Sequence, residues 1–351
     1  MSTRRLPRLG PRTAVAATAA VGSIVAGAAL QRRHLRAIAD DADFRRLSAP
    51  MGGRPLTIES ADGTALHAEA FGPERAPTVV LAHGWTEQLA FWGPVIRLLA
   101  GGGRRVVAYD LRGHGASGSA TDDDYSMERF GEDVEAVLAT AGGDEPVTVV
   151  GHSLGAMSIA AWAEHHEPAA RARAAALVNT GLGDLISGHL LIPEVARWLN
   201  RPWAGRALLS ARAPLPPFSS PLQQAVIRYS AFGPGASAGD VAFYERMLME
   251  TPPAVRAATG IALSDMNLWD AVVKLTIPTL VVAGERDRLT PPDHARRIVR
   301  ALPNPAGLIE LPGTGHMSPL ERPRELSEAI ERLVTDTATA SASAAREGLP
   351  Q

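Results

Sequence analysis

The 351-residue chain carries a formal net charge of −2, with 46% hydrophobic and 21% charged residues, and it contains no cysteine. This balance is typical of a soluble globular protein with a sizeable core, and the near-zero charge argues against a protein built to bind nucleic acid, which normally shows a basic patch. The absence of cysteine excludes a disulfide framework, a thiolate metal site and a cysteine nucleophile.

The N-terminal part of the chain includes a candidate membrane segment. The stretch Ala14–Leu30 contains no charged residue, and its length is at the short end of what spans a bilayer as a helix. Arginines flank it on both sides, at Arg4, Arg5, Arg8, Arg12, Arg32, Arg33 and Arg36. Because both flanks are basic, the positive-inside rule leaves the orientation of such a segment open.

Three interpretations of this leader, residues 1–51, compete. An uncleaved membrane anchor fits the length and the absence of charge. A cleaved export signal fits the basic start, the apolar middle and the small residues Ala26-Gly27-Ala28, and Arg4-Arg5 weakly resembles a twin-arginine signal. An amphipathic or disordered leader without a membrane role is the third. The first two predict a location in the bacterial cell envelope, and the third leaves the protein in the cytoplasm.

A charged segment, Asp40–Met51, predicts a linker into the folded domain. From about Leu56, short β-rich runs alternate with helical patterns, which is typical of a mostly parallel, doubly wound α/β sheet covered by helices. Leu56–Glu59 and Ala65–Phe71 flank the turn dipeptide Asp62-Gly63 and so predict an antiparallel hairpin.

The strands that follow are continuous apolar runs, as expected where both faces of a sheet are buried. They are Thr78–Ala82, Arg105–Tyr109, Val147–Val150, Ala174–Val178, Leu280–Ala283 and Leu308–Leu311. Helical patterns separate them at Phe91–Ala100, Met127–Thr140, Leu154–His165, Pro292–Ala301 and Pro323–Val334.

A long insertion interrupts this alternation after the sixth strand. Between Asn179 and Ile277 no buried strand is visible, whereas apolar residues recur at helical spacing in Ile192–Leu199, Ala225–Tyr229 and Val241–Met249. A strandless insertion of this length predicts a helical cap over the sheet. The predicted division is a core of residues 52–179 and 272–335, a cap of 180–271, and a disordered tail of 336–351, which is rich in alanine, serine and threonine.

The first residue with a predicted chemical role is Ser153, at the centre of Gly151-His152-Ser153-Leu154-Gly155. A strand runs directly into this pentapeptide and a helical pattern follows, which is the arrangement that a nucleophile elbow requires. We expect glycine on either side because a side chain there would collide with the neighbouring strand and helix. The helix N-terminus would also stabilise negative charge that develops near the serine.

A serine nucleophile needs a base at neutral pH. The best candidate is His316, which follows the last strand on the glycine-rich loop Leu311-Pro312-Gly313-Thr314-Gly315. The alternative is an ordinary surface histidine, since the chain has ten. The position of His316 after a strand favours the base.

The base in turn needs a carboxylate that orients the imidazole and stabilises its cation. Asp287, just past the penultimate strand, is the preferred candidate, because the loop after that strand would bring it beside the histidine. Glu285, Asp184 and Asp270 are its rivals. The resulting order along the chain is nucleophile, acid, base, as expected for a nucleophile elbow of this kind.

Acyl transfer also requires hydrogen-bond donors for the oxyanion. Leu154, directly after the nucleophile, would supply one backbone N–H, and Trp85 in His83-Gly84-Trp85-Thr86 is the preferred second donor. We expect the ring of His83 to order this loop rather than to act as a second base.

Taken together, these segments resemble the α/β-hydrolase superfamily, and within it the capped esterase, lipase and cofactor-free haloperoxidase-like branch. The similarity covers about Leu56–Val334. It depends on His83-Gly84-Trp85, Asp110-Leu111-Arg112-Gly113-His114-Gly115-Ala116-Ser117, Gly151–Gly155, Gly284–Asp287 and Gly315-His316. The resemblance implies the triad and oxyanion roles given above, and it implies a mainly structural role for the Asp110–Ser117 turn. Ala156 replaces the family's usual third glycine after the elbow.

Serine at position 153 argues against the aspartate-nucleophile members of the superfamily and favours transfer of an acyl group to water. The predicted cap contains many large apolar residues, which favours an ester with a hydrophobic, lipid-like acyl group. They are Trp198, Trp203, Phe218, Phe232, Phe243, Tyr244, Met247 and Met249, and we expect most of them to pack the cap itself.

No metal-ligand cluster or dinucleotide fingerprint is visible, so no cofactor and no metal are predicted. The alternatives are a haloperoxidase or perhydrolase activity from the same triad, and a non-catalytic binding protein on the same fold.

Overall fold

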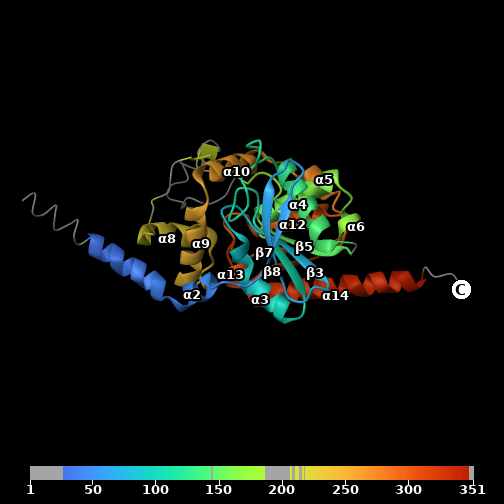
Figure 1. Cartoon of the computed structure of the whole chain (residues 1–351), viewed down its shortest axis with the longest axis horizontal. Coiled ribbons are helices and arrows are strands. Elements are labelled where there is room, and N and C mark those ends of the chain that lie inside the picture. Colours follow the sequence, from blue (N-terminus) through green and yellow to red (C-terminus); the bar gives the residue numbers. More distant parts are fainter. Residues whose placement is uncertain are drawn as a thin grey trace, which may run out of the picture.

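The structure, a computed structural model, describes residues 27–143, 145–185, 206–207, 210–212, 216 and 218–347, with side chains as far as residue 340. Its centre is an eight-stranded sheet in the order β1-β2-β4-β3-β5-β6-β7-β8 (Figure 1). The strands are β1 (Arg54–Glu59), β2 (Ala65–Phe71), β3 (Thr78–Ala82), β4 (Arg105–Tyr109), β5 (Val147–His152), β6 (Ala172–Val178), β7 (Thr279–Gly284) and β8 (Pro305–Leu311). All eight predicted strands are present.

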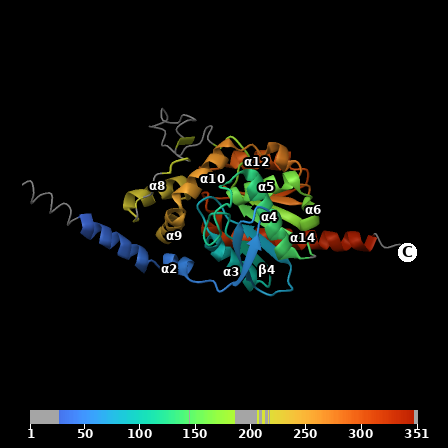
Figure 2. The same cartoon turned by 45° about the horizontal axis from the view of Figure 1, so that its top comes forward.

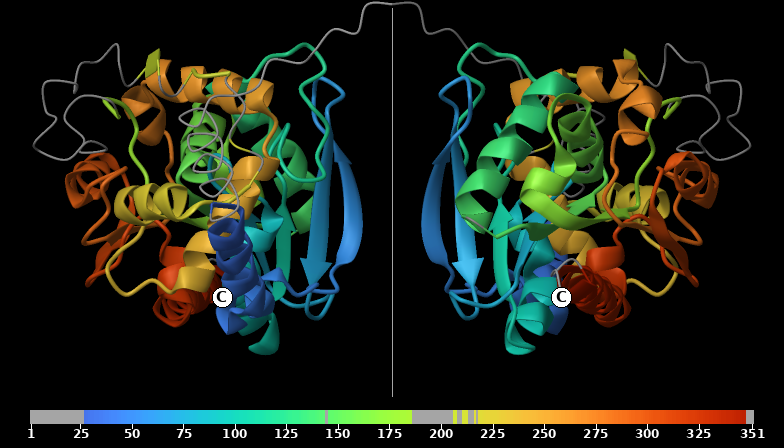
Figure 3. Two further views of the ribbon diagram at one scale, coloured as in Figure 1. Left: turned by 90° about the vertical axis from the view of Figure 1, so that its left-hand side faces the viewer. Right: turned by 90° about the vertical axis from the view of Figure 1, so that its right-hand side faces the viewer.

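The sheet is parallel from β4 to β8 and antiparallel at one edge. β1 and β2 pair as the predicted hairpin, and β2 pairs antiparallel with β4. Figure 3 shows this hairpin in blue at the edge of the sheet. The parallel pairs place the carboxyl ends of β3, β5, β6, β7 and β8 along one border. Ligand sites of open α/β sheets form at such a border.

Helices cover both faces of the sheet (Figures 1 and 2). One face carries α4 (Met127–Gly142), α5 (Leu154–His165), α11 (Trp269–Val272) and α12 (Pro292–Ala301), and the other carries α3 (Gly93–Gly101) and α14 (Pro323–Glu347). Shorter helices are η1 (Leu89–Trp92), α6 (Pro168–Arg171) and α13 (Ser318–Glu321). Side chains of β3 alternate between the two faces: Val80 belongs to the first hydrophobic core, and Val79 and Leu81 belong to the second. Burial on both faces explains why the strand is apolar from Val79 to Ala82.

The described part of the long insertion between β6 and β7 contains helices joined by loops, and no strand. It contains α8 (Pro221–Ala231), α9 (Ala238–Glu250), α10 (Pro253–Asp265) and α11. The pattern at Ala225–Tyr229 falls in α8 and that at Val241–Met249 falls in α9, whereas Ile192–Leu199 lies outside the described residues. Phe243 and Met247 of α9 are buried in the second core, so this helix packs on the sheet domain.

The prediction of a linker at Asp40–Met51 is wrong. Residues 27–40 are helical and α2 (Ala42–Ser48) follows, lying beside α9 in Figures 1 and 2. The Asp41 carboxylate caps α2 by accepting a hydrogen bond from the backbone N–H of Phe44, Leu47 is buried, and the Arg246 guanidinium stacks over the Phe44 ring at 5.4 Å. Tertiary contacts with α9 therefore stabilise a short helix that its charged composition did not indicate.

Most of the candidate membrane segment lies outside the described residues. In the part of the chain that the structure does describe, no helix is both long enough and apolar enough to cross a bilayer.

The predicted disordered tail is also wrong as far as residue 347. Helix α14 continues to Glu347 and projects from the body of the molecule in Figure 1. Alanine is the strongest helix former, and the alanine-rich sequence extends the amphipathic helix that begins against the sheet. The Thr337 hydroxyl is buried and donates to the Leu333 carbonyl at 2.7 Å, so the helix is still packed at the start of the predicted tail.

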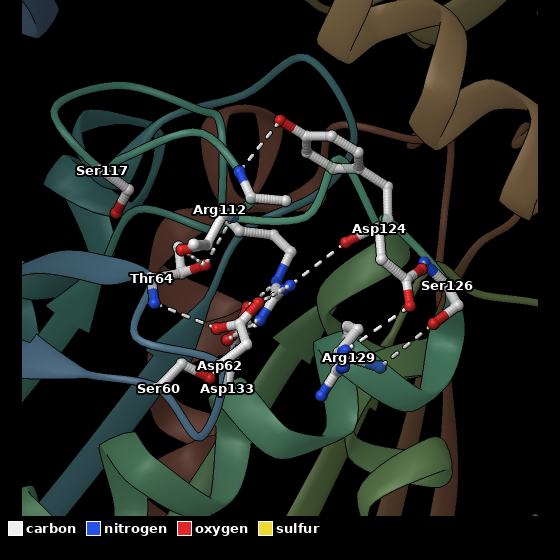
Figure 4. Close-up of polar contacts among 12 residues, drawn as sticks. Ser60, Asp62, Thr64, Arg112, Ser117, Asp124, Ser126, Arg129 and Asp133 are labelled. Carbon is white, nitrogen blue, oxygen red and sulfur yellow. Dashed lines mark hydrogen bonds and ion pairs between the residues drawn. The ribbon is translucent and has the colours of Figure 1, made fainter.

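A buried arginine joins the antiparallel edge to the rest of the core (Figure 4). Arg112, in the turn after β4, makes two 2.7 Å hydrogen bonds to the Asp133 carboxylate on α4. It also donates to Asp62, in the turn between β1 and β2, at 2.9 Å, and to the carbonyl of Asp124 at 3.1 Å. Arg112 and Asp133 are fully buried, which fits the structural role implied for this turn.

Candidate active site

Ser153 lies in a sharp turn between β5 and α5, at the border of the sheet. Its backbone has φ +49° and ψ −114°, a conformation that is strained for a residue with a side chain. The turn is fixed by its backbone, since the N–H of Ser153 donates to Val178 at 2.9 Å and its carbonyl accepts from the Thr180 hydroxyl at 3.0 Å. Ser153 caps the N-terminus of a twelve-residue helix without using its own hydroxyl.

The two glycines of the turn are required by close approaches of the backbone. A Cβ at Gly151 would lie 2.4 Å from the backbone nitrogen of Ala156. A Cβ at Gly155 would lie 2.3 Å from the carbonyl oxygen of Ala82, at the end of β3. These collisions are the ones expected from the sequence, and Ala156 is accommodated fully buried.

His316 and Asp287 meet at the same border of the sheet. Nδ1 of His316, in the loop after β8, lies 2.8 Å from Oδ2 of Asp287, in the loop after β7, and both side chains are buried. The second carboxylate oxygen accepts the backbone N–H groups of Leu289 at 2.8 Å and Thr290 at 2.9 Å. A carboxylate at Nδ1 places the ring proton there and leaves the lone pair on Nε2.

This pair shifts both pKa values in the direction of an ion pair. Burial opposes the charge on Asp287, but the His316 cation and the hydrogen bonds from His316, Thr290 and Asn179 lower its pKa below the ordinary value. Burial likewise disfavours the imidazolium, but Asp287 first, and then Glu87 and Glu321, raise the pKa of His316. Such an arrangement supports a histidine that gains a proton during a reaction.

The rival carboxylates lie elsewhere. The Glu285 side chain is half-exposed and accepts the backbone N–H of Gly313 at 2.8 Å. Asp184 lies 3.9 Å from Arg297 near the surface, and Asp270 is exposed on α11. Asp287 alone among the four has a hydrogen bond to His316 among the described contacts.

The sequence did not indicate a second layer of residues around Asp287. The Asn179 side chain donates to Oδ2 of Asp287 at 2.9 Å and to the Gly315 carbonyl at 3.2 Å, and it accepts a hydrogen bond from the Ser318 hydroxyl. The Thr290 hydroxyl donates to the same oxygen of Asp287 at 2.8 Å. A signal was available, because Asn179 directly follows β6 at the carboxyl border, where polar side chains gather around a site.

The predicted oxyanion donors belong to two adjacent turns. Leu154 is the first residue of α5, and Trp85 follows β3. The Trp85 indole donates to the carbonyl of Arg256 in α10 at 3.1 Å, and the Thr86 hydroxyl lies 3.0 Å from the Tyr244 hydroxyl in α9. The helical insertion therefore contacts the loop that carries Trp85.

His83 orders this loop, as expected. Its Nε2 accepts the backbone N–H of Leu111 at 3.0 Å, which leaves Nδ1 to donate to the Gly84 carbonyl at 2.8 Å. Burial and the neighbouring His114 and His152 hold the pKa of His83 well below its ordinary value, although the hydrogen bond to the Gly84 carbonyl acts to raise it. His114 has the same tautomer: its Nε2 accepts the backbone N–H of Thr86 at 3.3 Å, and its Nδ1 donates to the Arg112 carbonyl at 3.0 Å. Burial lowers the pKa of His114 to about 4.

Among the described residues, no group of three or more acidic or histidine side chains is arranged to hold a metal ion.

A doubly wound sheet with a serine in a strained strand–helix turn, and a histidine–aspartate pair at the same border, defines a protein of the α/β-hydrolase class. The family model described as the alpha/beta hydrolase fold matches residues 77–323. The chain belongs to this family, and it is an enzyme.

Its relatives include esterases and peroxidase-type enzymes. The chain is 27% identical over 268 residues to a bifunctional esterase/perhydrolase of Acinetobacter calcoaceticus, covering 75% of this chain and 93% of that one. It is 26% identical to a non-heme chloroperoxidase of Burkholderia pyrrocinia, covering 74% and 92%. A solved structure of a hydrolase from Pseudomonas aeruginosa superposes with a TM-score of 0.64 at 26% identity, covering 81% and 99%.

Proposed function

We propose that this enzyme is a serine hydrolase that cleaves a carboxylic ester through an acyl-enzyme on Ser153. The observation that carries the proposal is the 2.8 Å contact between His316 and Asp287 at the border where the Ser153 turn lies. The esterase activity named for the Acinetobacter relative supports the reaction class.

The proposed reaction uses these residues in sequence. Nε2 of His316 takes the proton from the Ser153 hydroxyl as its oxygen attacks the ester carbonyl, and Asp287 stabilises the imidazolium that forms. The backbone N–H groups of Leu154 and Trp85 stabilise the oxyanion. Collapse of this intermediate releases the alcohol, which receives the proton from His316, and leaves the acyl group on serine. A water molecule, activated by the same histidine, then releases the acid.

The proposed substrate has a hydrophobic acyl group. Support comes from the contacts of the helical insertion, residues 180–271 in the proposed domain division, with the Trp85 loop. Several of its large apolar residues, including Phe232, Phe243 and Met247, are buried in the second hydrophobic core, whereas Phe218 is half-exposed. Trp198 and Trp203 lie outside the described residues.

The experiment combines p-nitrophenyl esters of graded chain length with a fluorophosphonate probe, which labels an activated serine. Labelling of the native enzyme and its loss in Ser153→Ala are the expected results, and labelling that persists in Ser153→Ala contradicts the nucleophile assignment. We expect His316→Ala to lose about 10⁴-fold or more in kcat. Full activity in that variant would remove histidine from the mechanism, and a preference for the shortest esters would contradict the hydrophobic acyl group.

A second candidate function is peroxide-dependent chemistry at the same residues. It is favoured by the perhydrolase and chloroperoxidase activities named for two relatives. Comparing turnover with and without hydrogen peroxide separates the two, because a perhydrolase transfers the acyl group to peroxide in preference to water.

We also propose that the leader directs the enzyme to the bacterial cell envelope. The uncharged stretch Ala14–Leu30 between two groups of arginines supports the proposal. Fractionation of cells that express the full chain or a chain without residues 1–36 tests it. Membrane or periplasmic recovery should depend on the leader, and an unchanged distribution after its deletion would contradict the proposal.

A further inference from the structure

A second buried histidine–carboxylate pair lies next to the His316–Asp287 pair. Nδ1 of His152, the residue before Ser153, lies 3.0 Å from Oε2 of Glu87. The exposed fractions of the two side chains are 0% and 2%. The rings of His152 and His316 are 4.9 Å apart between centroids, yet the reaction proposed above uses neither His152 nor Glu87.

The pair has a backbone partner at each end. Nε2 of His152 lies 2.8 Å from the carbonyl oxygen of His316, and Oε2 of Glu87 accepts the backbone N–H of Gly84. One continuous chain of hydrogen bonds therefore runs from the loop that carries Trp85 to the loop that carries His316. It passes through the residue adjacent to Ser153.

Counting donors shows that the pair shares a proton. The carbonyl of His316 can only accept, so Nε2 of His152 carries a hydrogen. The contact between Nδ1 and the Glu87 carboxyl group then requires one further proton, either on the imidazole or on the carboxyl group. The pair is neutral overall in both forms, which avoids leaving an uncompensated charge at this depth.

The histidine–carboxylate pair is closely packed on both sides, by Gly84 on one and by aromatic rings on the other. A Cβ on Gly84 would lie 2.9 Å from Oε2 of Glu87 and 3.0 Å from Nδ1 of His152. On the imidazole side, the Phe91 ring lies 4.8 Å and the Trp92 ring 6.4 Å from the His152 ring, between centroids. The glycine is thus fitted to the pair on one side, and aromatic rings enclose it on the other.

We propose that Glu87 and His152 are positioning residues, whose shared proton holds the oxyanion loop against the backbone of His316. The inference rests on the proposed function, since it assigns catalytic roles to Trp85 and His316. A fixed distance between the oxyanion donor and the base matters because a displacement of about 1 Å can cost about 100-fold in rate. The pair acts on the reaction through these two loops, and Glu87 also helps Asp287 to raise the pKa of His316.

Glu87→Gln is the sharpest test because it keeps the size of the side chain and removes the shared proton. A neutral His152 that donates from Nε2 to the His316 carbonyl can only accept at Nδ1, so the atom of the new side chain beside it must be the amide nitrogen. An amide nitrogen cannot also accept the Gly84 N–H, which Oε2 of Glu87 accepts in the native enzyme, so one link of the chain is lost. We expect kcat for p-nitrophenyl esters to fall about 10- to 100-fold with KM unchanged within about twofold. The rate of fluorophosphonate labelling at Ser153 should fall in parallel, since it needs the same base and oxyanion donors.

His152→Gln and the double variant test whether the two residues act as a unit. We expect His152→Gln to lose as much kcat as Glu87→Gln, and the double variant to lose no more than either single change. Losses that multiply in the double variant would show that each side chain acts separately, and would overturn the proposal.

Phe91→Leu is the matched control. It alters the packing of the same imidazole without touching the hydrogen-bonded chain. We expect a lower melting temperature, with kcat unchanged within about twofold. A loss of kcat in this variant equal to that of Glu87→Gln would mean that any disturbance of the core has this effect, which contradicts a positioning role.

Proton NMR with ¹⁵N-labelled histidine supplies a readout independent of turnover. The native enzyme should show two strongly downfield ring N–H signals, one from each histidine–carboxylate pair, and Glu87→Gln should lose only the signal of His152. If both signals persist in Glu87→Gln, the two residues do not share a proton and the proposal is wrong.

The two proposals can fail separately. If His316→Ala is inactive and Glu87→Gln is fully active, only the positioning role is wrong. If His316→Ala is active, the proposed function itself is wrong.

Discussion

At the scale of single residues, the distinctive feature of the site is a histidine whose charge is set by its neighbours. The pKa of His316 is raised, mainly by Asp287, against the effect of burial. In the proposed reaction His316 is the general base, which must be neutral to accept a proton, so we expect the protonated form that predominates below this pKa to be inactive. We therefore expect kcat/KM to rise with pH through a pKa above about 6.5, the ordinary histidine value.

Asp287→Asn tests the origin of that pKa. The change removes the charge that favours the imidazolium but keeps the ring buried, so the acidic limb of the kcat/KM profile should move to lower pH. The rate should fall about 10⁴-fold, because the amide favours the wrong tautomer of the imidazole. A limb that stays in place would contradict the assignment of Asp287 as the residue that raises the pKa.

Asn179 offers a second residue-scale prediction. It has φ +47° and donates to both Asp287 and Gly315, so Asn179→Ala should combine backbone strain with lost hydrogen bonds. Asn179→Gly relieves the strain and loses only the hydrogen bonds. We expect both variants to lose about tenfold or more in kcat, and the alanine variant to have the lower melting temperature. Equal melting temperatures would argue against strain at this position.

The sequence singled out candidate residues that follow strands more readily than it indicated the residues that contact them. Ser153, Asp287 and His316 each stand just after a predicted strand, and strand ends meet at one border whatever the details of packing. The contact of Glu87 with His152 joins positions 65 residues apart, and that of Asn179 with Asp287 joins positions 108 apart. Such pairings depend on loop conformations, for which a single sequence has no periodic signal.

At the scale of elements, the strand–turn–helix unit around Ser153 depends on how closely α5 approaches β3. We expect Gly155→Ala to destabilise the protein by about 1–3 kcal/mol, because the added methyl group would overlap the carbonyl of Ala82. Gly101→Ala, at the end of α3, is the control, since its Cβ would meet nothing within 4 Å. Urea unfolding should show no loss of stability in the control. Equal losses in both variants would contradict the steric argument.

Element boundaries were predicted well where a local signal exists and poorly where tertiary contacts decide. Helix α12 is strongly amphipathic, and its predicted bounds, Pro292–Ala301, are those observed. Helix α2 was missed because its stability comes from Arg246 and the core of α9, which a local pattern does not contain. The extension of α14 was missed because small residues suggested disorder, although alanine also favours helix.

At the scale of the whole molecule, the sequence predicted all eight strands and the antiparallel hairpin, but not how the hairpin is fastened to the parallel sheet. That attachment uses Arg112, which connects the β1–β2 turn, the turn after β4 and helix α4 (Figure 4). The guanidinium is held by the side chains of Asp62 and Asp133 and by the carbonyl of Asp124, and Asp62 and Asp133 lie 71 residues apart in the sequence. Only the folded chain brings them together.

Arg112→Met should therefore destabilise the whole domain. It would leave the fully buried Asp133 carboxylate without its cation, and breaking a buried pair in this way costs about 3–5 kcal/mol. Arg129→Ala is the control: its guanidinium pairs with Asp122 at 3.2 Å on the surface, where such a pair contributes about 1 kcal/mol or less. The free energy of unfolding in urea at pH 7 measures both changes.

The pH dependence of the Arg112→Met defect separates a charge effect from lost packing. Without the guanidinium, burial holds the folded-state pKa of the Asp133 carboxyl above its unfolded value, so the folded state binds the proton more tightly. The free energy of unfolding of the variant should then recover relative to the native enzyme as the pH falls towards that pKa. A deficit that does not change with pH would show that Arg112 stabilises the molecule through its packing alone, and the hairpin would then be held by shape rather than by charge.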